Sequence, residues 1–379
     1  MIYLDHNAIT PVRPEAREAV LLALDRFGNP SSVHRAGRDA RDVLELGRDR
    51  VARAIGARPR DVVFTSGATE GAALAIRGVL GAAAEGRRRL VVTAVEHPCV
   101  LGLARELERR GVPLTVVPVD RRGEVDSAAF RAALGPDVAL ACAMRANNET
   151  GVLLPVAALA AAAREVGIPL LCDAVQAAGK VEVDVRTLGA ELVLLTGQKL
   201  GGPRGAGVLW IAPGLALAPL LGGEQERGRR AGTENLPGIA GLGAAIEAAA
   251  TRREEEAARL GALRDRLEDG LLAAVPRARV NGAGAPRLPN TSSIVFEGCD
   301  AETLLVAMDL EGLCASAGSA CHSGSTRPSG VLTAMGLSLT EARATIRFSL
   351  GWTSTAEEVE GALRIVPPLV ERVRAQVRL

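Results

Sequence analysis

Short apolar runs alternate with helical stretches from about residue 61 to residue 210, and this alternation limits the fold more than any other feature. The runs are apolar along their length and read DVVFTS, RLVVTAV, VPLTVVPV, VALACAM, IPLLCDA, ELVLLTG and GVLWIA. Alanine- and leucine-rich stretches lie between them, for example at residues 72–80, 100–110 and 156–166. Strands that are apolar throughout are covered on both faces, and strands separated by helices run mainly parallel. The sequence therefore predicts an α/β fold with a mainly parallel sheet flanked by helices, which binds ligands at the carboxyl ends of its strands.

The pattern changes after Gly238. A long helical stretch includes the charged segment TRREEEAARLGALRDRLEDG, and shorter units follow: NTSSIVFEG, a helix over residues 301–310, LCASAG, ATIRFSLG and a closing helix from about Thr355. This order is typical of a smaller α+β domain. We expect residues 15–255 to form a large domain, and residues 1–14 and 256–379 to form the small one.

Charge and composition exclude two classes of partner. The chain has 379 residues, a formal net charge of +1 and only 2% aromatic residues. It therefore lacks both the basic field and the stacking surfaces that non-specific nucleic-acid binding needs. The start, MIYLDHNAITPV, is unlike a secretory signal, and no later segment stays apolar for the roughly 20 residues of a membrane helix. We expect a cytoplasmic protein with no direct nucleic-acid or membrane partner.

One of the six cysteines stands apart from the others. Cys142 and Cys172 lie within apolar runs and are expected to be buried thiols, whereas Cys99 lies at a helix start and Cys299 beside a turn. Cys321 lies in GSACHSG, a stretch of small residues with no apolar periodicity, which indicates a loop. A metal site could be formed by Cys314, Cys321 and His322, with His97 and Cys99. The chain has no CxxC pair, however, and structural zinc sites usually have closely spaced ligands, so we predict no metal site.

Only two of the 45 basic residues are lysines, Lys180 and Lys199, and all the rest are arginine. Arginine stays protonated, whereas a desolvated lysine can become neutral and form a Schiff base. Lys199 comes just after an apolar run and before a glycine-rich turn, in LTGQKLGGPRGAGVLW. Its position at a strand end suits Schiff-base chemistry, although survival of two lysines in a compositional drift would also explain the count.

Asp173 ends the apolar run PLLCD, and a buried carboxylate there needs a cationic partner. A protonated pyridine nitrogen would serve, and a lysine with an aspartate is what pyridoxal phosphate requires. The alternative role of Asp173 is an ordinary cap for the helical segment AVQAAG. After another strand, Ser66 to Thr69 of TSGATEG open a helix whose N-terminus favours a phosphate.

Three further side chains fit the same pocket. Gln176 lies one helical turn after Asp173, and His97 in EHPC is suited to stack on a flat ring or to move a proton. Arg347 in ATIRFSLG has a planar guanidinium that can bind a carboxylate through two hydrogen bonds. A lone histidine or arginine more often has a structural role, and their joint presence with Lys199 favours a functional one.

Many segments of the chain resemble the NifS/IscS-type cysteine desulfurases of the class-V aminotransferase family. They are YLDHNAITPV, GNPSSVHRAGR, FTSGATEG, EHPCVL, NNETGVLLPV, DAVQAAGK, GGEQERGRRAGTENLPG, CASAGSACHSG, PSGVLTAMGL and IRFSLG. The match runs in order from Tyr3 to about Trp352. It implies an aspartate aminotransferase-like fold (fold type I) with pyridoxal 5'-phosphate as cofactor.

The resemblance also implies a role for each site residue. Lys199 forms the Schiff base, Asp173 pairs with the pyridine nitrogen, His97 stacks on the ring and Gln176 binds the phenolic oxygen. The residues expected to hold the substrate carboxylate are Asn148 and Arg347, and those expected at the phosphate are Ala68 through its backbone, Thr69, Thr196 and Gln198. Thr233 of AGTEN would reach the phosphate of the other subunit, which implies a homodimer.

By the same resemblance, the Cys321 thiolate attacks the sulfur of a bound L-cysteine, which leaves L-alanine and a persulfide on the enzyme. The sulfur then passes to an acceptor protein, such as an iron–sulfur scaffold or a thiolation factor. Two alternatives remain at this point: a selenocysteine lyase or other β-lyase of the same fold, and a sulfur-relay or scaffold protein without turnover. The retained lysine, aspartate and cysteine argue against the scaffold.

The chain departs from the family pattern at a few positions. Gln198 stands where histidine usually precedes the Schiff-base lysine, and His6 and Ile9 replace a usual asparagine and threonine. Ala72 and Ala73 replace an asparagine pair, and a histidine common in the family is replaced at position 145 by arginine. Glutamine donates a hydrogen bond but brings no charge, so the affinity for the cofactor is the property we expect to change.

Overall fold

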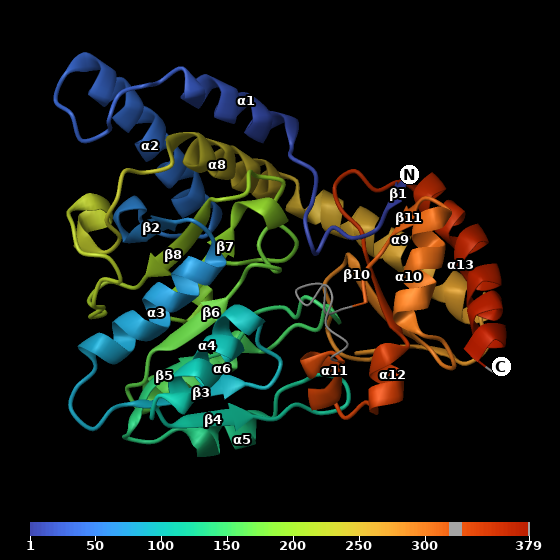
Figure 1. Cartoon of the computed structure of the whole chain (residues 1–379). Coiled ribbons are helices and arrows are strands. Elements are labelled where there is room, and N and C mark those ends of the chain that lie inside the picture. Colours follow the sequence, from blue (N-terminus) through green and yellow to red (C-terminus); the bar gives the residue numbers. More distant parts are fainter. Residues whose placement is uncertain (318–327, 378–379) are drawn as a thin grey trace.

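A computed structural model of the chain describes residues 1–317 and 328–377. A seven-stranded sheet forms its centre, in the order β2-β8-β7-β6-β5-β3-β4 (Figure 1). The strands are β2 (Val62–Thr65), β3 (Arg89–Thr93), β4 (Leu114–Val117), β5 (Val138–Cys142), β6 (Leu170–Asp173), β7 (Leu192–Thr196) and β8 (Gly207–Ile211). Neighbours from β4 to β7 run parallel, and β8 alone is antiparallel to both of its neighbours. The predicted α/β fold and its mainly parallel sheet are confirmed.

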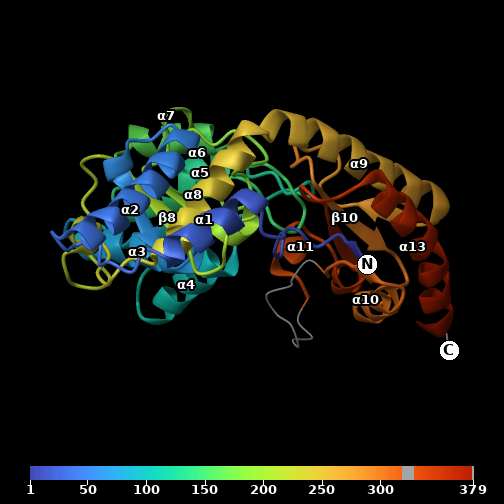
Figure 2. The ribbon, with the colours of Figure 1, turned by 90° about the horizontal axis from the view of Figure 1, so that it is seen from above.

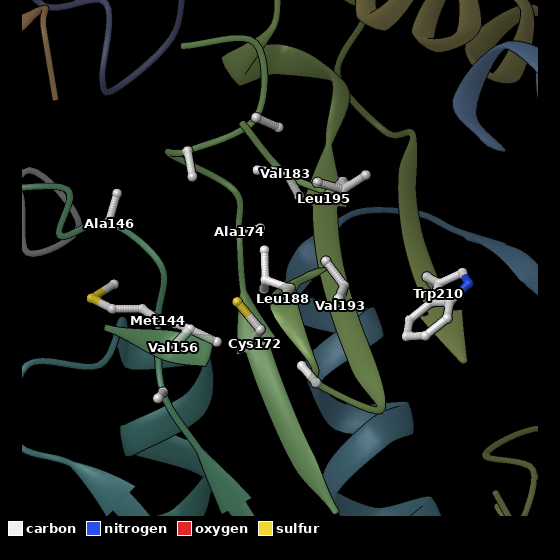
Figure 3. Packing of buried hydrophobic residues seen from close by; sticks show 14 of the residues in the cluster. Met144, Ala146, Val156, Cys172, Ala174, Val183, Leu188, Val193, Leu195 and Trp210 are labelled. Atoms are coloured by element: carbon white, nitrogen blue, oxygen red, sulfur yellow. The ribbon is translucent and has the colours of Figure 1, made fainter. Parts of the chain in front are cut away.

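Alternate residues along each strand enter two different cores, as the pleat of a strand requires. On one face, Val91, Cys172 and Val193 pack with Trp210 beneath α2 (Arg35–Ala54), α6 (Val156–Glu165) and α8 (Leu236–Thr251). Figure 3 shows Cys172, Val193 and Trp210 in this core. On the other, Leu90, Leu171 and Leu194 pack against α3 (Ala68–Ala82) and α4 (Pro98–Arg109). Burial raises the pKa of the thiols of Cys142 and Cys172, which confirms them as core cysteines.

Two helices that the apolar pattern did not single out pack against α8. They are α1 (Pro14–Leu24) and α2, and both pack on α8. The shorter helices α5 (Ser127–Ala133) and α7 (Val185–Leu188) complete this part of the chain. Within residues 1–317 and 328–377, none of the helices combines the length and the apolar character needed to cross a membrane.

The C-terminal part is built on the three-stranded antiparallel sheet β12-β10-β9. Its strands are β9 (Ala278–Val280), β10 (Thr291–Phe296) and β12 (Thr345–Ser349), and its helices are α9 (Arg253–Ala274), α10 (Ala301–Leu310), α11 (Gly330–Ala334), α12 (Leu339–Arg343) and α13 (Ala356–Val377). A separate apolar core joins α9, α10 and α13 to this sheet. Figure 2 shows α9 passing from the end of α8 to this part.

The first residues of the chain belong to this C-terminal part in space. The strand β1 (Ile2–Tyr3) pairs in parallel with β11 (Leu313–Cys314), and Asp5 forms an isolated bridge with Ser349. Leu4 lies in the C-terminal apolar core. Residues 5–10 therefore run along the junction between the two parts of the molecule before α1 begins.

Candidate active site

A cavity of about 900 Å³ opens at the carboxyl ends of the parallel strands. Its lining includes ten of the residues singled out from the sequence: Ala68, Thr69, His97, Asn148, Asp173, Gln176, Thr196, Gln198, Lys199 and Arg347. One other residue, Thr233, does not line it. Thr233 is exposed on the segment before α8, and Cys321 lies outside the described residues. Segments far apart in the sequence thus meet at one edge of the sheet, as the fold class predicts.

Lys199 lies in the 3-10 turn Gly197–Lys199, directly after β7. Its Nζ donates a hydrogen bond to the backbone carbonyl of Asn7 at 2.8 Å and another to that of Ala8. The turn that follows requires glycine, because Gly201 has a φ of +84°. The amine is therefore held at the cavity by carbonyls of the N-terminal segment.

Asp173 ends β6 and is only 5% exposed. Its Oδ1 accepts a hydrogen bond from the N–H of Val175 at 2.9 Å, so Asp173 also caps the turn that follows its strand. Burial raises the pKa of its carboxyl, while the nearby His97 and Lys199 act in the opposite direction. A carboxylate in this position is stabilised by any cation that enters the cavity, which makes capping and ligand binding compatible.

His97 also has a structural role beside its place in the cavity. It is the N-cap of α4, and its Nδ1 accepts a hydrogen bond from the N–H of Cys99 at 3.2 Å. Burial lowers the pKa of the imidazole. A neutral ring whose Nδ1 accepts must carry its proton on Nε2, so the cap fixes the tautomer of this histidine.

The N-terminus of α3 faces the cavity without a side-chain cap from the described residues. Its N-cap is Gly67, and a Cβ on Gly207 of β8 would lie only 2.5 Å from the Cα of Gly67. Glycine at position 207 therefore lets β8 approach the turn closely. The first-turn N–H groups and the helix dipole together form an anion site.

Two neighbouring side chains at this end bind each other. The Thr196 hydroxyl donates a hydrogen bond to Oε1 of Gln198 at 2.6 Å. This leaves the amide nitrogen of Gln198 as the group available to an anion. Glu70, in the first turn of α3, pairs with Arg230 at 2.7 Å, which offsets its negative charge near the anion site.

A buried ion pair anchors the segment that leads to Thr233. Glu226 accepts hydrogen bonds from the Arg48 guanidinium at 2.8 and 2.9 Å and from the N–H of Phe64 at 2.9 Å. Both charged side chains are almost fully buried, at 3% and 1% exposure. The segment after β8 is therefore fixed to α2 and β2.

Arg347 lies in the middle of β12 and is 1% exposed. Its Nη2 donates to Oδ1 of Asp5 at 2.6 Å, and its Nη1 donates to the carbonyl of Asn148 at 3.0 Å. The same carbonyl accepts from Nδ2 of Asn7 at 3.2 Å. Arg347 is thus held in a fixed orientation by an acidic side chain and a carbonyl from two other segments.

Several polar residues around the cavity did not emerge from residue-level reasoning. They are Asp5, Asn7, Glu96 and Glu149. The sequence indicates Lys180 only as one of the two lysines, and it does not predict the contact of Lys180 with Gln176. The signal that would have found them is their position inside the segments YLDHNAITPV, EHPCVL, NNETGVLLPV and DAVQAAGK. No cluster of three or more His, Cys, Asp or Glu side chains suited to a metal occurs in residues 1–317 and 328–377.

Glu96 connects two strand ends beneath the cavity. Its Oε1 accepts hydrogen bonds from the Thr93 hydroxyl at 2.6 Å and from the N–H of Met144 at 2.7 Å. Its Oε2 is buried without a hydrogen-bond partner among the described residues. Burial raises the pKa of this carboxyl to about 8, so Glu96 is a neutral acid over much of the physiological range.

Comparison with known proteins places the chain in a family. The family model for class-V aminotransferases matches residues 2–361. A cysteine desulfurase of Cereibacter sphaeroides is 47% identical over 378 residues, which cover 99% of this chain and 97% of the relative. A solved NifS-like protein superposes with a TM-score of 0.92 at 31% identity, over 98% of this chain and 99% of the other. A solved structure titled SspA in complex with cysteine has a TM-score of 0.81 at 32% identity, over 92% and 99% of the two chains. With the strand-end cavity and its lysine, these similarities show that the chain belongs to the class-V aminotransferase family, and within it to the NifS-like cysteine desulfurases.

Proposed function

We infer that this chain is a pyridoxal-phosphate-dependent cysteine desulfurase, which converts L-cysteine into L-alanine and keeps the sulfur as a persulfide. The observation that carries this inference is a single cavity that holds an amine, a buried carboxylate and a buried guanidinium: Lys199, Asp173 and Arg347. An amino acid and an electron-withdrawing ring would use these three groups together.

The residues of the cavity fit pyridoxal phosphate. Asp173 is buried with a raised carboxyl pKa, so a protonated ring nitrogen beside it would relieve the cost of its charge. The uncapped N-terminus of α3 suits the phosphate, with Thr69 and the amide nitrogen of Gln198 nearby. Lys199 would supply the amine that holds the aldehyde carbon of the cofactor. When bound, the cofactor withdraws electrons from the α-carbon of the substrate.

The other residues of the cavity orient the ring and the substrate. The face of His97 is expected to lie against the ring, with its tautomer set by the Cys99 N–H. The amide NH₂ of Gln176 is expected to bind the phenolic oxygen. Arg347 and Asn148 are expected to bind the substrate carboxylate. Since Asp5 already orients the Arg347 guanidinium, this group would be held in place before the substrate carboxylate binds.

Cys321 is the proposed sulfur acceptor, and the described residues on either side of it support this role. Ser316 exchanges backbone hydrogen bonds with Arg347 at 2.6 and 3.1 Å, and the Ser329 hydroxyl donates to Glu149. Pro328, Gly330 and Val331 line the cavity. Cys321 follows Ser316 by five positions, and five residues span at most about 17 Å. The described residues on either side of Cys321 therefore lie beside the proposed substrate site.

The sulfur transfer is a displacement at the substrate sulfur. The Cys321 thiolate forms a bond to that sulfur while the carbon–sulfur bond of the substrate breaks. The carbon retains the electron pair of the broken bond and takes up a proton, which gives alanine. The persulfide on Cys321 then passes its outer sulfur to an acceptor protein.

The experiment mixes the purified protein and pyridoxal phosphate with L-cysteine and measures alanine, sulfide and enzyme-bound persulfide together. The natural chain should give alanine and persulfide in equal amounts in the first turnover. Cys321→Ser should keep bound cofactor but form neither persulfide nor more than a trace of alanine. Undiminished turnover in Cys321→Ser would show that the chain is instead a β-lyase that needs no persulfide.

Lys199→Ala separates the cofactor assignment from the sulfur assignment. Borohydride should fix the cofactor covalently in the natural chain and in Cys321→Ser, but not in Lys199→Ala. Fixation on Lys180 would contradict the role given to Lys199.

We also propose that the chain works as a homodimer. Thr233 is exposed and outside the cavity of its own chain, as a residue that serves the partner's phosphate would be. Phe27 and Val33, between α1 and α2, are 91% and 86% exposed. The α1–α2 turn and the segment between β8 and α8 lie at the same end of the molecule (Figures 1 and 2). The exposed apolar side chains and the exposed Thr233 at one end of the molecule together support a contact with another chain there.

A further inference from the structure

We propose that Lys180 is a positioning residue of the cofactor site, because its amine holds the Gln176 amide with the oxygen toward Lys180 and the NH₂ group toward Asn7. This inference rests on the proposed function, in which Gln176 binds the phenolic oxygen of the cofactor. It gives a role to the second of the two lysines, which the proposed chemistry leaves without one.

Hydrogen bonds at both ends fix the Gln176 amide. The Nζ of Lys180 donates to Oε1 of Gln176 at 3.1 Å and to its backbone carbonyl at 3.0 Å. The Nε2 of Gln176 donates to the carbonyl of Asn7 at 2.9 Å, and the same carbonyl accepts from Lys199. In the flipped amide, an oxygen would face the Asn7 carbonyl and an NH₂ group would face an amine. While the Lys180 amine is protonated, the flip would replace these two side-chain hydrogen bonds with one contact between two oxygens and one between two donors.

The orientation matters because only one end of the amide can donate. The phenolic oxygen of the cofactor carries negative charge and needs a donor. Gln176 is 4% exposed and lines the cavity, whereas Lys180 does not line it. Lys180 therefore acts through Gln176 and keeps the donor end of the amide on the cavity side.

The surroundings explain why this position keeps a lysine in a chain that otherwise uses arginine. The space next to Lys180 is a cavity of about 30 Å³, lined also by His6, Lys199 and Trp352. A guanidinium keeps its charge, whereas a buried lysine amine can lose its proton, so only lysine can become neutral beside Lys199 and Arg347. Burial, with the charges of Lys199 and Arg347, lowers the pKa of Lys180 to about 7. An amine in either protonation state has the two N–H donors that Gln176 uses.

A double-mutant cycle tests the proposal with four proteins: the natural chain, Lys180→Met, Gln176→Leu and the double variant. Each cofactor-free protein is titrated with pyridoxal phosphate, and the affinity and the absorbance maximum of the bound cofactor are measured. Lys180→Met should weaken binding about fivefold, which corresponds to about 1 kcal/mol, the contribution of one ordinary hydrogen bond. It should also move the absorbance maximum toward that of Gln176→Leu. In the Gln176→Leu background, the same change should alter the affinity less than twofold.

Equal losses of affinity from Lys180→Met in both backgrounds would overturn the proposal, and so would an unchanged affinity in the natural background. Arg60→Met, at an exposed arginine, is the control for removal of one positive charge and should match the natural chain. Thermal unfolding of the cofactor-free proteins identifies a variant that fails to fold. In that case Lys180→Gln replaces Lys180→Met in the cycle. A natural chain that binds no pyridoxal phosphate would instead contradict the proposed function.

Discussion

Gln198 is the residue at which this chain departs most clearly from the family that it resembles, and its surroundings explain how the departure is tolerated. Its side-chain oxygen is occupied by the Thr196 hydroxyl at 2.6 Å, which turns its amide nitrogen into the donor for a phosphate. The N-terminus of α3 supplies further donors from the backbone. The phosphate end therefore does not depend on one charged side chain.

Gln198→His should bind pyridoxal phosphate about fivefold more tightly, with little change in turnover at saturating cofactor. A hydrogen bond from a charged donor contributes about 1 kcal/mol more than one from a neutral amide, which corresponds to that factor. The measurement is a titration of the cofactor-free proteins followed by the assay with L-cysteine. If Gln198→His created an activity that the natural chain lacks, the natural chain would be a scaffold rather than an enzyme.

At the scale of the elements, Glu96 joins the ends of β3 and β5 through Thr93 and Met144. Its pKa in the folded chain is about 8, above the ordinary value of 4.5. A group with a raised folded pKa stabilises the folded state fully only below its unfolded pKa, and this stabilisation is lost as the pH rises toward the folded pKa. The stabilisation that the protonated Glu96 gives the folded chain is therefore lost between about pH 4.5 and about pH 8.

Glu96→Gln should remove this dependence on pH. Relative to the natural chain, its free energy of unfolding should rise by on the order of 4 kcal/mol between pH 5 and pH 8, since each pKa unit corresponds to about 1.4 kcal/mol. Urea unfolding of the cofactor-free proteins at both pH values measures the difference. Glu302→Gln, at an exposed glutamate of α10, should follow the natural chain. An identical pH dependence in all three proteins would mean that Glu96 is already ionised.

The elements themselves were largely predictable, and the exceptions have physical reasons. Every apolar run became a strand of the central sheet, and the helix expected at residues 301–310 is α10. The reversed direction of β8 could not be predicted, because an apolar run reads the same whichever way its strand points. The long helical stretch expected after Gly238 consists of two helices, α8 and α9, which meet at Arg252 where the chain leaves one core for the other.

At the scale of the whole molecule, the proposed homodimer predicts a mass of two chains in solution. Phe27→Asp should shift it toward single chains, because burial of a carboxylate at the contact without a cationic partner is costly. The dissociated chain should also bind pyridoxal phosphate more weakly, since the partner's Thr233 is then missing. Analytical ultracentrifugation and cofactor titration measure the two effects.

Leu310→Asp is the matched control, because Leu310 is 81% exposed on α10, far from the α1–α2 turn. It should leave both the mass and the affinity unchanged. A natural chain that sediments as a monomer, or a Phe27→Asp variant that remains a dimer, would contradict the proposed interface.

The molecule as a whole also shows which parts of the site lay beyond residue-level reasoning. Lys199 and Asp173 each follow an apolar run, so local sequence indicated them. Asn7 and Asp5 contribute through contacts with residues more than 140 positions away, and no local pattern records such a pairing. The division into residues 15–255 and residues 1–14 with 256–379 remains a prediction, as do the individual roles of the site residues.

The N-terminal segment at the junction has a consequence for how the protein is made. Asp5 and Arg347 are 342 positions apart, and a ribosome adding about 5–20 residues per second needs on the order of 20 to 70 s to make the second after the first. Once residue 211 has been made, the central sheet has all its strands, but the segment whose Asn7 and Ala8 carbonyls hold Lys199 is not yet fixed by β12. We therefore expect a nascent chain to complete the cavity, and to bind its cofactor, only after β12 has been made.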